Sequence, residues 1–266
     1  MTKPIGIFDS GVGGLTVYKA IRAAFPSEDL IYFGDTARVP YGPKSHHTVI
    51  EYSVQNARFL LQKGIKALVV ACNTASAVAL PALQELAQIP VIGVIEPGAE
   101  MVAQLSQNQK IGVIGTEGTI RSGAYTQAIL SLLPNAQVFS RACPLLVPLA
   151  EEGWLDHPVT RLVVKDCLGE YKEKGIDTLV LGCTHYPLLK ALFAEELGAG
   201  VNLVDSADAI ALHLKSILPP CDTQRLGVDK FYVSDNEEKF HQLASRILGM
   251  KNLQLQRLRL FESWFE

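Results

Sequence analysis

The 266-residue sequence lacks an apolar run long enough to cross a membrane. Its longest apolar region, residues 67–83, is interrupted by Asn, Thr, Ser and Pro, whereas a spanning helix needs about 20 apolar residues. The apolar run in the N-terminal stretch MTKPIGIFDSG is too short for a signal peptide. We therefore expect a cytoplasmic protein with no membrane partner.

Positive charge is also scarce. Lys and Arg total 24 against 27 Asp and Glu, which gives a formal net charge of −3, and no basic cluster interrupts this balance. Nucleic-acid binding depends on clustered cations that neutralise phosphates. We therefore expect no nucleic-acid partner.

Two kinds of motif are absent or incomplete. The five cysteines are odd in number and widely spaced, with no C-x-x-C pair, so they are typical of free thiols in a reducing compartment. The segment DSGVGG (9–14) provides Gly11 and Gly13, but Thr16 stands where G-x-G-x-x-G requires a third glycine, and no G-K-[ST] occurs. We expect these glycines to permit a tight turn and close backbone approach to a small ligand.

Short apolar runs alternate with longer helical patterns, which predicts an α/β fold with parallel sheets flanked by helices on both faces. The predicted strands are 5–9, 30–35, 67–72, 91–96, 110–116, 177–183 and 201–206. The predicted helices of the first half are 15–25, 48–64 and 76–88.

An internal repeat indicates two similar lobes. GIKALVVACNTA begins at Gly64 and GIDTLVLGCTHY at Gly175, and each carries a cysteine eight residues after its glycine. PIGIFDSGVGG likewise corresponds to KIGVIGTEGTI, VPYGP (39–43) to VPLAE (147–151), and VIGVIEP to VNLVDS. Such a repeat predicts pseudo-twofold related lobes with the active site between them.

The C-terminal part contains a strand-like segment at 231–235, a helical pattern near 237–248 and the run LQLQRLRLF at 253–261. We expect this part to return to the first lobe. The predicted domains are therefore residues 1–97 plus 207–266 for the first, discontinuous lobe and 98–206 for the second.

Polar residues follow the predicted strands, where ligands bind in open parallel sheets. They are Asp9, Ser10, Asp35, Cys72, Asn73, Thr74, Glu96, Thr116, Cys183, Thr184, His185 and Asp205.

Cys72 and Cys183 stand out because they occupy equivalent positions of the repeat, whereas Cys143, Cys167 and Cys221 have no counterpart and are interpreted as structural. A disulfide between Cys72 and Cys183 is not favoured in a reducing cytoplasm. A zinc site using both thiols and His185 has no supporting ligand spacing, so we expect no metal.

Two thiols facing one cleft suit a proton transfer at carbon. A thiolate on one face removes a proton, and a thiol on the other face returns one, so that the carbon is inverted without a cofactor. Asn73, Thr74 and Thr184 have two interpretations: they cap the helices that follow, or they hold a carboxylate there. Asp9 either caps or handles protons near Cys72.

Other residues are open to two interpretations. His185, two residues after Cys183, is suited to tuning or relaying protons. The spacing of the repeat does not distinguish Glu151 from Glu152 as the candidate site residue. Tyr41 and Gly42 belong to a turn that can form a wall of the cleft.

The motifs GIFDSGVGGLTV, YFGDTARVPYG, ACNTASA, LGCTHYP and the segment from Gly115 to Tyr125 occur in this order along nearly the whole chain. Together they resemble the glutamate racemases of the cofactor-independent aspartate/glutamate racemase superfamily. The resemblance implies interconversion of L- and D-glutamate, provision of D-glutamate for peptidoglycan, no cofactor, and a homodimer.

The resemblance also implies residue roles. Cys72 and Cys183 are the catalytic acid-bases, Asp9 assists the first, and His185 with Glu151, rather than Glu152, assists the second. The implied substrate contacts are Asp9, Ser10, Tyr41, Gly42, Asn73, Thr74, Thr116, Thr119, Thr184 and His185.

Two alternatives remain open from the sequence. A racemase acting on aspartate or another acidic substrate differs by as little as one methylene, a discrimination of about 1–3 kcal/mol. A two-lobed protein that only binds a small carboxylate needs no second thiol.

Overall fold

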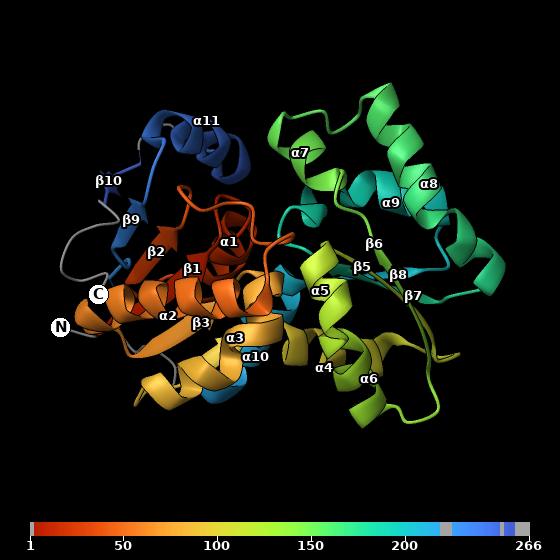
Figure 1. Ribbon diagram of the computed structural model, residues 1–266, viewed down its shortest axis with the longest axis horizontal. Helices are drawn as coiled ribbons and strands as arrows, with labels where there is room; N and C mark the ends of the chain where they lie inside the picture. Colours follow the sequence, from red (N-terminus) through yellow and green to blue (C-terminus); the bar gives the residue numbers. More distant parts are fainter. Residues whose placement is uncertain (1–2, 219–224, 251–252, 259–266) are drawn as a thin grey trace.

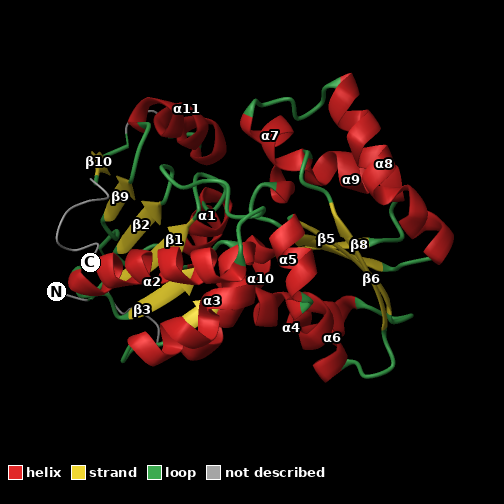
Figure 2. Cartoon of the chain, viewed as in Figure 1, coloured by secondary structure: helices red, strands yellow, loops and turns green. Residues whose placement is uncertain are grey.

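The computed structural model describes residues 3–218, 225–250 and 253–258, and its strands form two sheets in which every pairing is parallel (Figure 1). Cys221 and the last residues of the predicted run 253–261 lie outside the described residues. Helices surround both sheets (Figure 2), so the predicted α/β class is confirmed.

The first sheet has the strand order β10-β9-β2-β1-β3-β4. Its strands are β1 (Ile5–Asp9), β2 (Leu30–Gly34), β3 (Ala67–Val70), β4 (Val91–Gly93), β9 (Asp229–Val233) and β10 (Leu255–Arg257). The second sheet has the order β6-β5-β7-β8. Its strands are β5 (Lys110–Gly115), β6 (Gln137–Ala142), β7 (Thr178–Gly182) and β8 (Asn202–Asp205).

The strand order β2-β1-β3-β4 in the first sheet is repeated as β6-β5-β7-β8 in the second. β3 and β7, which precede Cys72 and Cys183, occupy the same place in this order. The sequence repeat therefore corresponds to a repeated topology.

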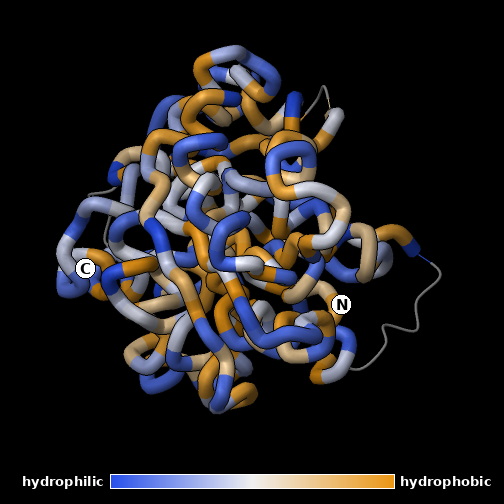
Figure 3. The backbone as a smooth tube through the Cα atoms, turned by 90° about the vertical axis from the view of Figure 1, so that its right-hand side faces the viewer, coloured by the Kyte–Doolittle hydropathy of each residue, from blue (hydrophilic) through white to orange (hydrophobic). Residues whose placement is uncertain are grey.

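Successive residues of a strand point to opposite sides of the sheet. Because the central strands are buried along their whole length, each sheet is covered by helices on both faces. Ile5 and Ile7 of β1 pack with α1 (Leu15–Ala24), α10 (Ser206–Ile217) and α11 (Glu237–Leu248). Phe8 packs on the other face with α2 (His46–Gln62) and α3 (Asn73–Leu86). Hydrophobic backbone segments accordingly run through the middle of the molecule (Figure 3).

The second sheet has the same layered arrangement. One face packs against α7 (Leu146–Glu151), α8 (Pro158–Lys174) and α9 (Lys190–Leu197). The other packs against α4 (Ile95–Leu105) and α6 (Ala124–Leu132). The short helix α5 (Glu117–Ser122) follows β5.

The chain passes between the lobes twice. α4 packs on the second sheet, and α10, which follows β8, returns to the core of the first lobe. β9 then pairs with β2, and β10 with β9. These contacts support the division at 97/98 and 206/207, which stays a prediction.

One predicted strand was wrong in its extent, and one strand was not predicted. The strand predicted over 91–96 ends at Gly93, and Glu96 is an exposed residue in the first turn of α4. β6 was not predicted, because this edge strand has few apolar residues and is only half-buried.

The end of β9 is tied to the loop after β2 by a buried hydroxyl. Ser234 Oγ donates to Asp35 Oδ1 at 2.9 Å and accepts from the Ala37 N–H at 2.9 Å. The C-terminal segment therefore fixes the loop that leads to Tyr41.

Removal of this hydroxyl tests the anchor. We expect Ser234→Ala to lower the free energy of unfolding by about 1–3 kcal/mol, because it leaves a buried carboxylate oxygen and an N–H without this partner. Urea denaturation followed by tryptophan fluorescence measures the change. The control is Ser131→Ala, which removes an exposed hydroxyl on α6. Equal stabilities of the two variants would contradict the prediction.

Candidate active site

The carboxyl ends of the two sheets border one cavity of about 370 Å³. Cys72, after β3, and Cys183, after β7, both line it. The first lobe also contributes Ser10, Val39, Pro40, Tyr41, Gly42, Pro43, Asn73 and Thr74, and the second contributes Thr116, Glu117, Pro144, Val147, Pro148, Glu151, Thr184 and His185.

Two of the residues with an implied catalytic or substrate-binding role do not line this cavity, and neither do the strand-end candidates Asp35, Glu96 and Asp205. Asp9 and Thr119 are buried behind the residues that do. The sequence analysis did not identify the apolar wall formed by Val39, Pro40, Pro43, Pro144, Val147 and Pro148, or the adjacent Glu117. The correspondence of VPYGP with VPLAE in the repeat was the signal for most of this wall.

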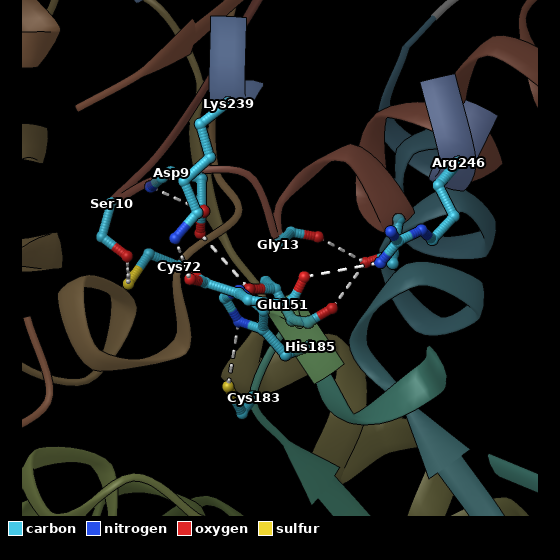
Figure 4. Close-up of polar contacts among 12 residues, drawn as sticks. Asp9, Ser10, Gly13, Cys72, Glu151, Cys183, His185, Lys239 and Arg246 are labelled. Carbon is cyan, nitrogen blue, oxygen red and sulfur yellow. Dashed lines mark hydrogen bonds and ion pairs between the residues drawn. The ribbon is translucent and has the colours of Figure 1, made fainter. Parts of the chain in front are cut away.

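Cys72 has a neutral polar neighbour. Its Sγ lies 3.7 Å from Ser10 Oγ, as Figure 4 shows. Burial, reinforced by the nearby Asp9 carboxyl, raises the pKa of Cys72 to about 12, although the Ala75 N–H and Ser10 oppose this rise. Cys72 is therefore a thiol at neutral pH.

Asp9 organises the glycine-rich turn from a fully buried position. Its Oδ2 accepts from the Gly11 N–H at 2.9 Å, and Thr184 Oγ1 lies 3.5 Å from its Oδ1. Burial raises the pKa of this carboxyl, while His185 and the backbone N–H groups of the turn lower it. Asp9 thus acts on Cys72 through the local field and does not hydrogen bond to it in the structure.

Cys183 has an ionisable neighbour instead. Its Sγ lies 3.7 Å from His185 Nδ1, and His185 Nε2 lies 3.1 Å from Glu151 Oε1. Burial alone would lower the pKa of His185, but the hydrogen bonds with Cys183 and Glu151 raise it to about 10. His185 is therefore an imidazolium at neutral pH, and its positive charge faces the thiol.

The structure distinguishes the two glutamates that were equivalent on spacing. Glu151 ends α7, lines the cavity and contacts His185, whereas Glu152 is exposed and does not line the cavity. His185 and Lys239 lower the pKa of the Glu151 carboxyl, against the opposing effect of burial. Glu151 is an ionised partner for the imidazolium.

The interpretation of Asn73, Thr74 and Thr184 as helix caps was wrong. Cys72 itself is the N-cap of α3, and no side chain makes a cap hydrogen bond there. Cys183 is followed by a 3₁₀ turn, Tyr186–Leu189, rather than by an α-helix start.

These side chains make contacts elsewhere. Asn73 Oδ1 accepts from Tyr125 Oη at 2.7 Å and from Ser206 Oγ at 3.1 Å. Thr74 Oγ1 lies 2.8 Å from Thr116 Oγ1 of the other lobe, and Thr119 Oγ1 joins this hydroxyl cluster. The hydroxyls can donate or accept, so the cluster adapts to an anionic ligand.

Tyr41 lines the cavity, and its hydroxyl already has two hydrogen-bond partners. The hydroxyl donates to Asp35 and accepts from Asn56 Nδ2, and Arg38 Nε donates to the same Asp35 oxygen at 2.7 Å. Asp35 therefore positions this wall of the cavity and does not itself line it.

Gly13 lies at a close contact between the two lobes. A Cβ atom on Gly13 would lie 2.4 Å from Thr184 Oγ1 and 2.6 Å from His185 Nδ1. The glycine is required for close approach, as expected, but the approach is to the second lobe rather than to a ligand.

Neither a metal-binding cluster nor a disulfide occurs among the described residues. Within the described ranges, no group of three His, Cys, Asp or Glu residues is placed to hold a metal ion. Cys72, Cys143, Cys167 and Cys183 are all buried free thiols. In the same part of the chain, no helix is long and apolar enough to span a membrane.

Comparison with known proteins gives consistent matches. Residues 5–214 match the family model described as Asp/Glu/Hydantoin racemase. A protein of Geobacter metallireducens named glutamate racemase is 55% identical over 253 residues, which cover 94% of each chain.

Solved structures agree. The crystal structure of a glutamate racemase isoform from Bacillus anthracis has a TM-score of 0.94 at 42% identity, covering 97% of this chain and 98% of that one. The glutamate racemase of Francisella tularensis in complex with D-glutamate has a TM-score of 0.91 at 40% identity, with the same coverage.

The charge of His185 can be measured directly. We expect its imidazole ¹⁵N resonances to titrate near pH 10 in the wild type and lower in Glu151→Gln. Because the folded pKa lies above the unfolded value of about 6.5, the stability gained is present below pH 6.5 and is lost as pH rises towards 10. Wild-type unfolding free energy should therefore fall more over this window than that of Glu151→Gln. A His185 midpoint near 6.5 would refute the assignment.

Proposed function

The chain belongs to the Asp/Glu/hydantoin racemase family, and from that premise we propose that it interconverts L- and D-glutamate by proton transfer between Cys72, Cys183 and the α-carbon. The observation that carries this proposal is that both thiols, from equivalent ends of the repeated sheets, line one cavity. The relatives cited above, which are 40–55% identical to this chain, are named glutamate racemases.

The proton transfer balances without any redox partner. One cysteine thiolate takes the α-hydrogen as a proton, and the electron pair of the C–H bond remains on the substrate, delocalised into its α-carboxylate. The other cysteine thiol then donates its proton to the opposite face of the α-carbon. The enzyme ends with the thiolate and thiol exchanged, and no cofactor is required.

Substrate carboxylates would be held without a Lys or Arg from the cavity wall. Among the described residues that line the cavity, none is Lys or Arg, and the His185 imidazolium is already paired with Glu151. The donors available include the hydroxyls of Ser10, Thr74, Thr116 and Thr184, the Asn73 Nδ2, which has no hydrogen-bond partner in the described chain, and the N–H groups at the start of α3. A helix N-terminus favours a carboxylate, and its field also stabilises charge that develops during proton removal.

The two half-sites, Cys72 with Ser10 and Cys183 with His185 and Glu151, would differ in their electrostatic surroundings. The His185 imidazolium, held by Glu151, lies 3.7 Å from Cys183 Sγ. Cys72 lies beside the neutral Ser10, and its raised pKa favours the thiol. The two cysteines are thus in different environments before substrate binds.

The two alternatives are weakened. A protein that only binds a carboxylate would have no use for a second thiol on the same cavity with its own His185–Glu151 pair. Action on aspartate is opposed by the names of the most similar relatives, and comparison of the two substrates in one assay decides between them.

The cellular role follows from the family resemblance. We propose that the D-glutamate supplies peptidoglycan synthesis and that the enzyme is a homodimer in the cytoplasm. The four cysteines that the structure describes are buried free thiols, which is consistent with a reducing compartment.

Exchange in deuterated water tests the mechanism. With no cofactor added, we expect deuterium at the α-carbon of product from either enantiomer, together with inversion. Cys72→Ser and Cys183→Ser should each lower racemisation by at least about 100-fold, as expected for loss of an acid-base group. Circular dichroism and ¹H NMR follow inversion and exchange.

The matched control is Cys167→Ser, because Cys167, Cys72 and Cys183 are each 5% exposed but Cys167 does not line the cavity. Racemisation by both site variants at the control's rate would rule out the two-thiol mechanism. A requirement for pyridoxal phosphate would rule it out as well.

A further inference from the structure

The Glu151 carboxylate is shared between two cations. Its Oε1 lies 3.1 Å from His185 Nε2, and its Oε2 lies 3.6 Å from Lys239 Nζ. Each oxygen therefore has one partner (Figure 4). A carboxylate bound at both oxygens has less freedom to rotate than one bound at a single oxygen.

The two cations belong to different lobes. Lys239 lies on α11, which packs on the first sheet, whereas His185 and Glu151 belong to the second lobe. α11 also reaches α7 through Arg246, whose Nη1 donates to the Glu151 carbonyl oxygen at 3.4 Å. Figure 1 shows α11 and α7 facing each other across the two lobes. The orientation of Glu151 thus depends on closure of the lobes.

We propose that Lys239 is a positioning residue: it holds the Glu151 carboxylate against His185 and thereby sets the balance between the two protonation states of the Cys72–Cys183 pair. This inference rests on the proposed racemase function. Lys239 does not line the main cavity, so its action on the reaction passes through Glu151.

The Cys72 half-site has no contact equivalent to the Lys239–Glu151 ion pair among the described residues. In the described chain, the polar contacts of Asp9 and Ser10 are with the turn, Thr184 and Cys72, and none involves Lys or Arg. A change at Lys239 therefore acts directly on the Cys183 half-site, and it reaches the Cys72 half-site only indirectly, through the effect of the His185 charge on Asp9.

Other charges near Glu151 lie outside its carboxylate contacts. Arg246 binds the backbone carbonyl, and Glu152 and Glu238 line the polar groove that Lys239 shares on the outer side. Neither glutamate accepts a hydrogen bond from Lys239 or His185 in the described chain. Lys239 is accordingly the cation that fixes the second carboxylate oxygen.

The symmetry of the reaction provides a specific readout. L- and D-glutamate have equal free energies in water, so kcat/KM must be equal in the two directions for every variant. The separate kcat values are not tied in this way, and their ratio depends on the relative free energies of the two protonation states with substrate bound. A loss of folded enzyme lowers both kcat values equally and leaves their ratio unchanged.

The experiment measures kcat and KM in both directions for Lys239→Gln, Lys239→Arg and the wild type. We expect Lys239→Gln to change the ratio of the two kcat values by about two- to fivefold, the range for loss of an exposed ion pair. Lys239→Arg should restore the wild-type ratio, because it keeps the cation.

The control is Lys172→Gln. Lys172 pairs with Glu196 on the second lobe, and the two pairs have nearly equal side-chain exposures, 50% and 23% against 50% and 20%. An unchanged ratio in Lys239→Gln, or an equal change in Lys172→Gln, would overturn the role of Lys239 and leave the proposed function intact. Absence of glutamate racemisation by the wild type would instead overturn the proposed function.

Discussion

The site depends on the close approach of Gly13 to Thr184 and His185, where the backbone of one lobe meets side chains of the other. This contact leaves no room for a Cβ atom, and it brings the carboxyl ends of two parallel sheets to one cavity. The hydrogen bonds that cross the lobes, such as Thr74 to Thr116 and the Gly118 N–H to the Gly42 carbonyl, require the same separation. Cavity, cysteine pair and lobe contact are therefore parts of one geometric constraint.

The repeat places the two cysteines at equivalent positions, whereas the sequence differences between the lobes give them different neighbours. β3 and β7 deliver Cys72 and Cys183 from equivalent places in the two sheets. Their partners differ: Ser10 is neutral, whereas His185 is charged and held by Glu151. Two identical half-sites would place the same groups beside both thiols. The observed neighbours differ, and the proposed proton transfer through the α-carbon needs two groups in different protonation states.

The sequence predicted the features that depend on local pattern and on the repeat. Apolar runs located the central strands, and the matched cysteines located two strand ends that meet at one cavity. It could not predict β6, because an edge strand buries little apolar surface and so has no clear apolar pattern. It also could not show that Asp9 and Thr119 lie behind the cavity wall, because this depends on tertiary packing. Nor could it show that Glu151 rather than Glu152 faces His185, because this depends on how α7 packs against the 3₁₀ turn after β7. The resemblance supplied the choice of Glu151 that spacing left open.

The arrangement of the lobes also explains why a fold of this kind suits inversion at carbon. Loss of the α-proton makes the α-carbon planar, and inversion then needs an acid on the face opposite the base. A single sheet offers strand ends along one edge, so its side chains approach a ligand from one side. Two sheets that meet at their carboxyl ends offer equivalent strand ends from both sides. In the proposed mechanism the cysteines would act on the two faces without movement of the substrate, while the lobes stay closed around the planar intermediate. The polar contacts that α11 makes with Glu151 lie at the same lobe boundary, beside the His185 side chain that contacts Cys183.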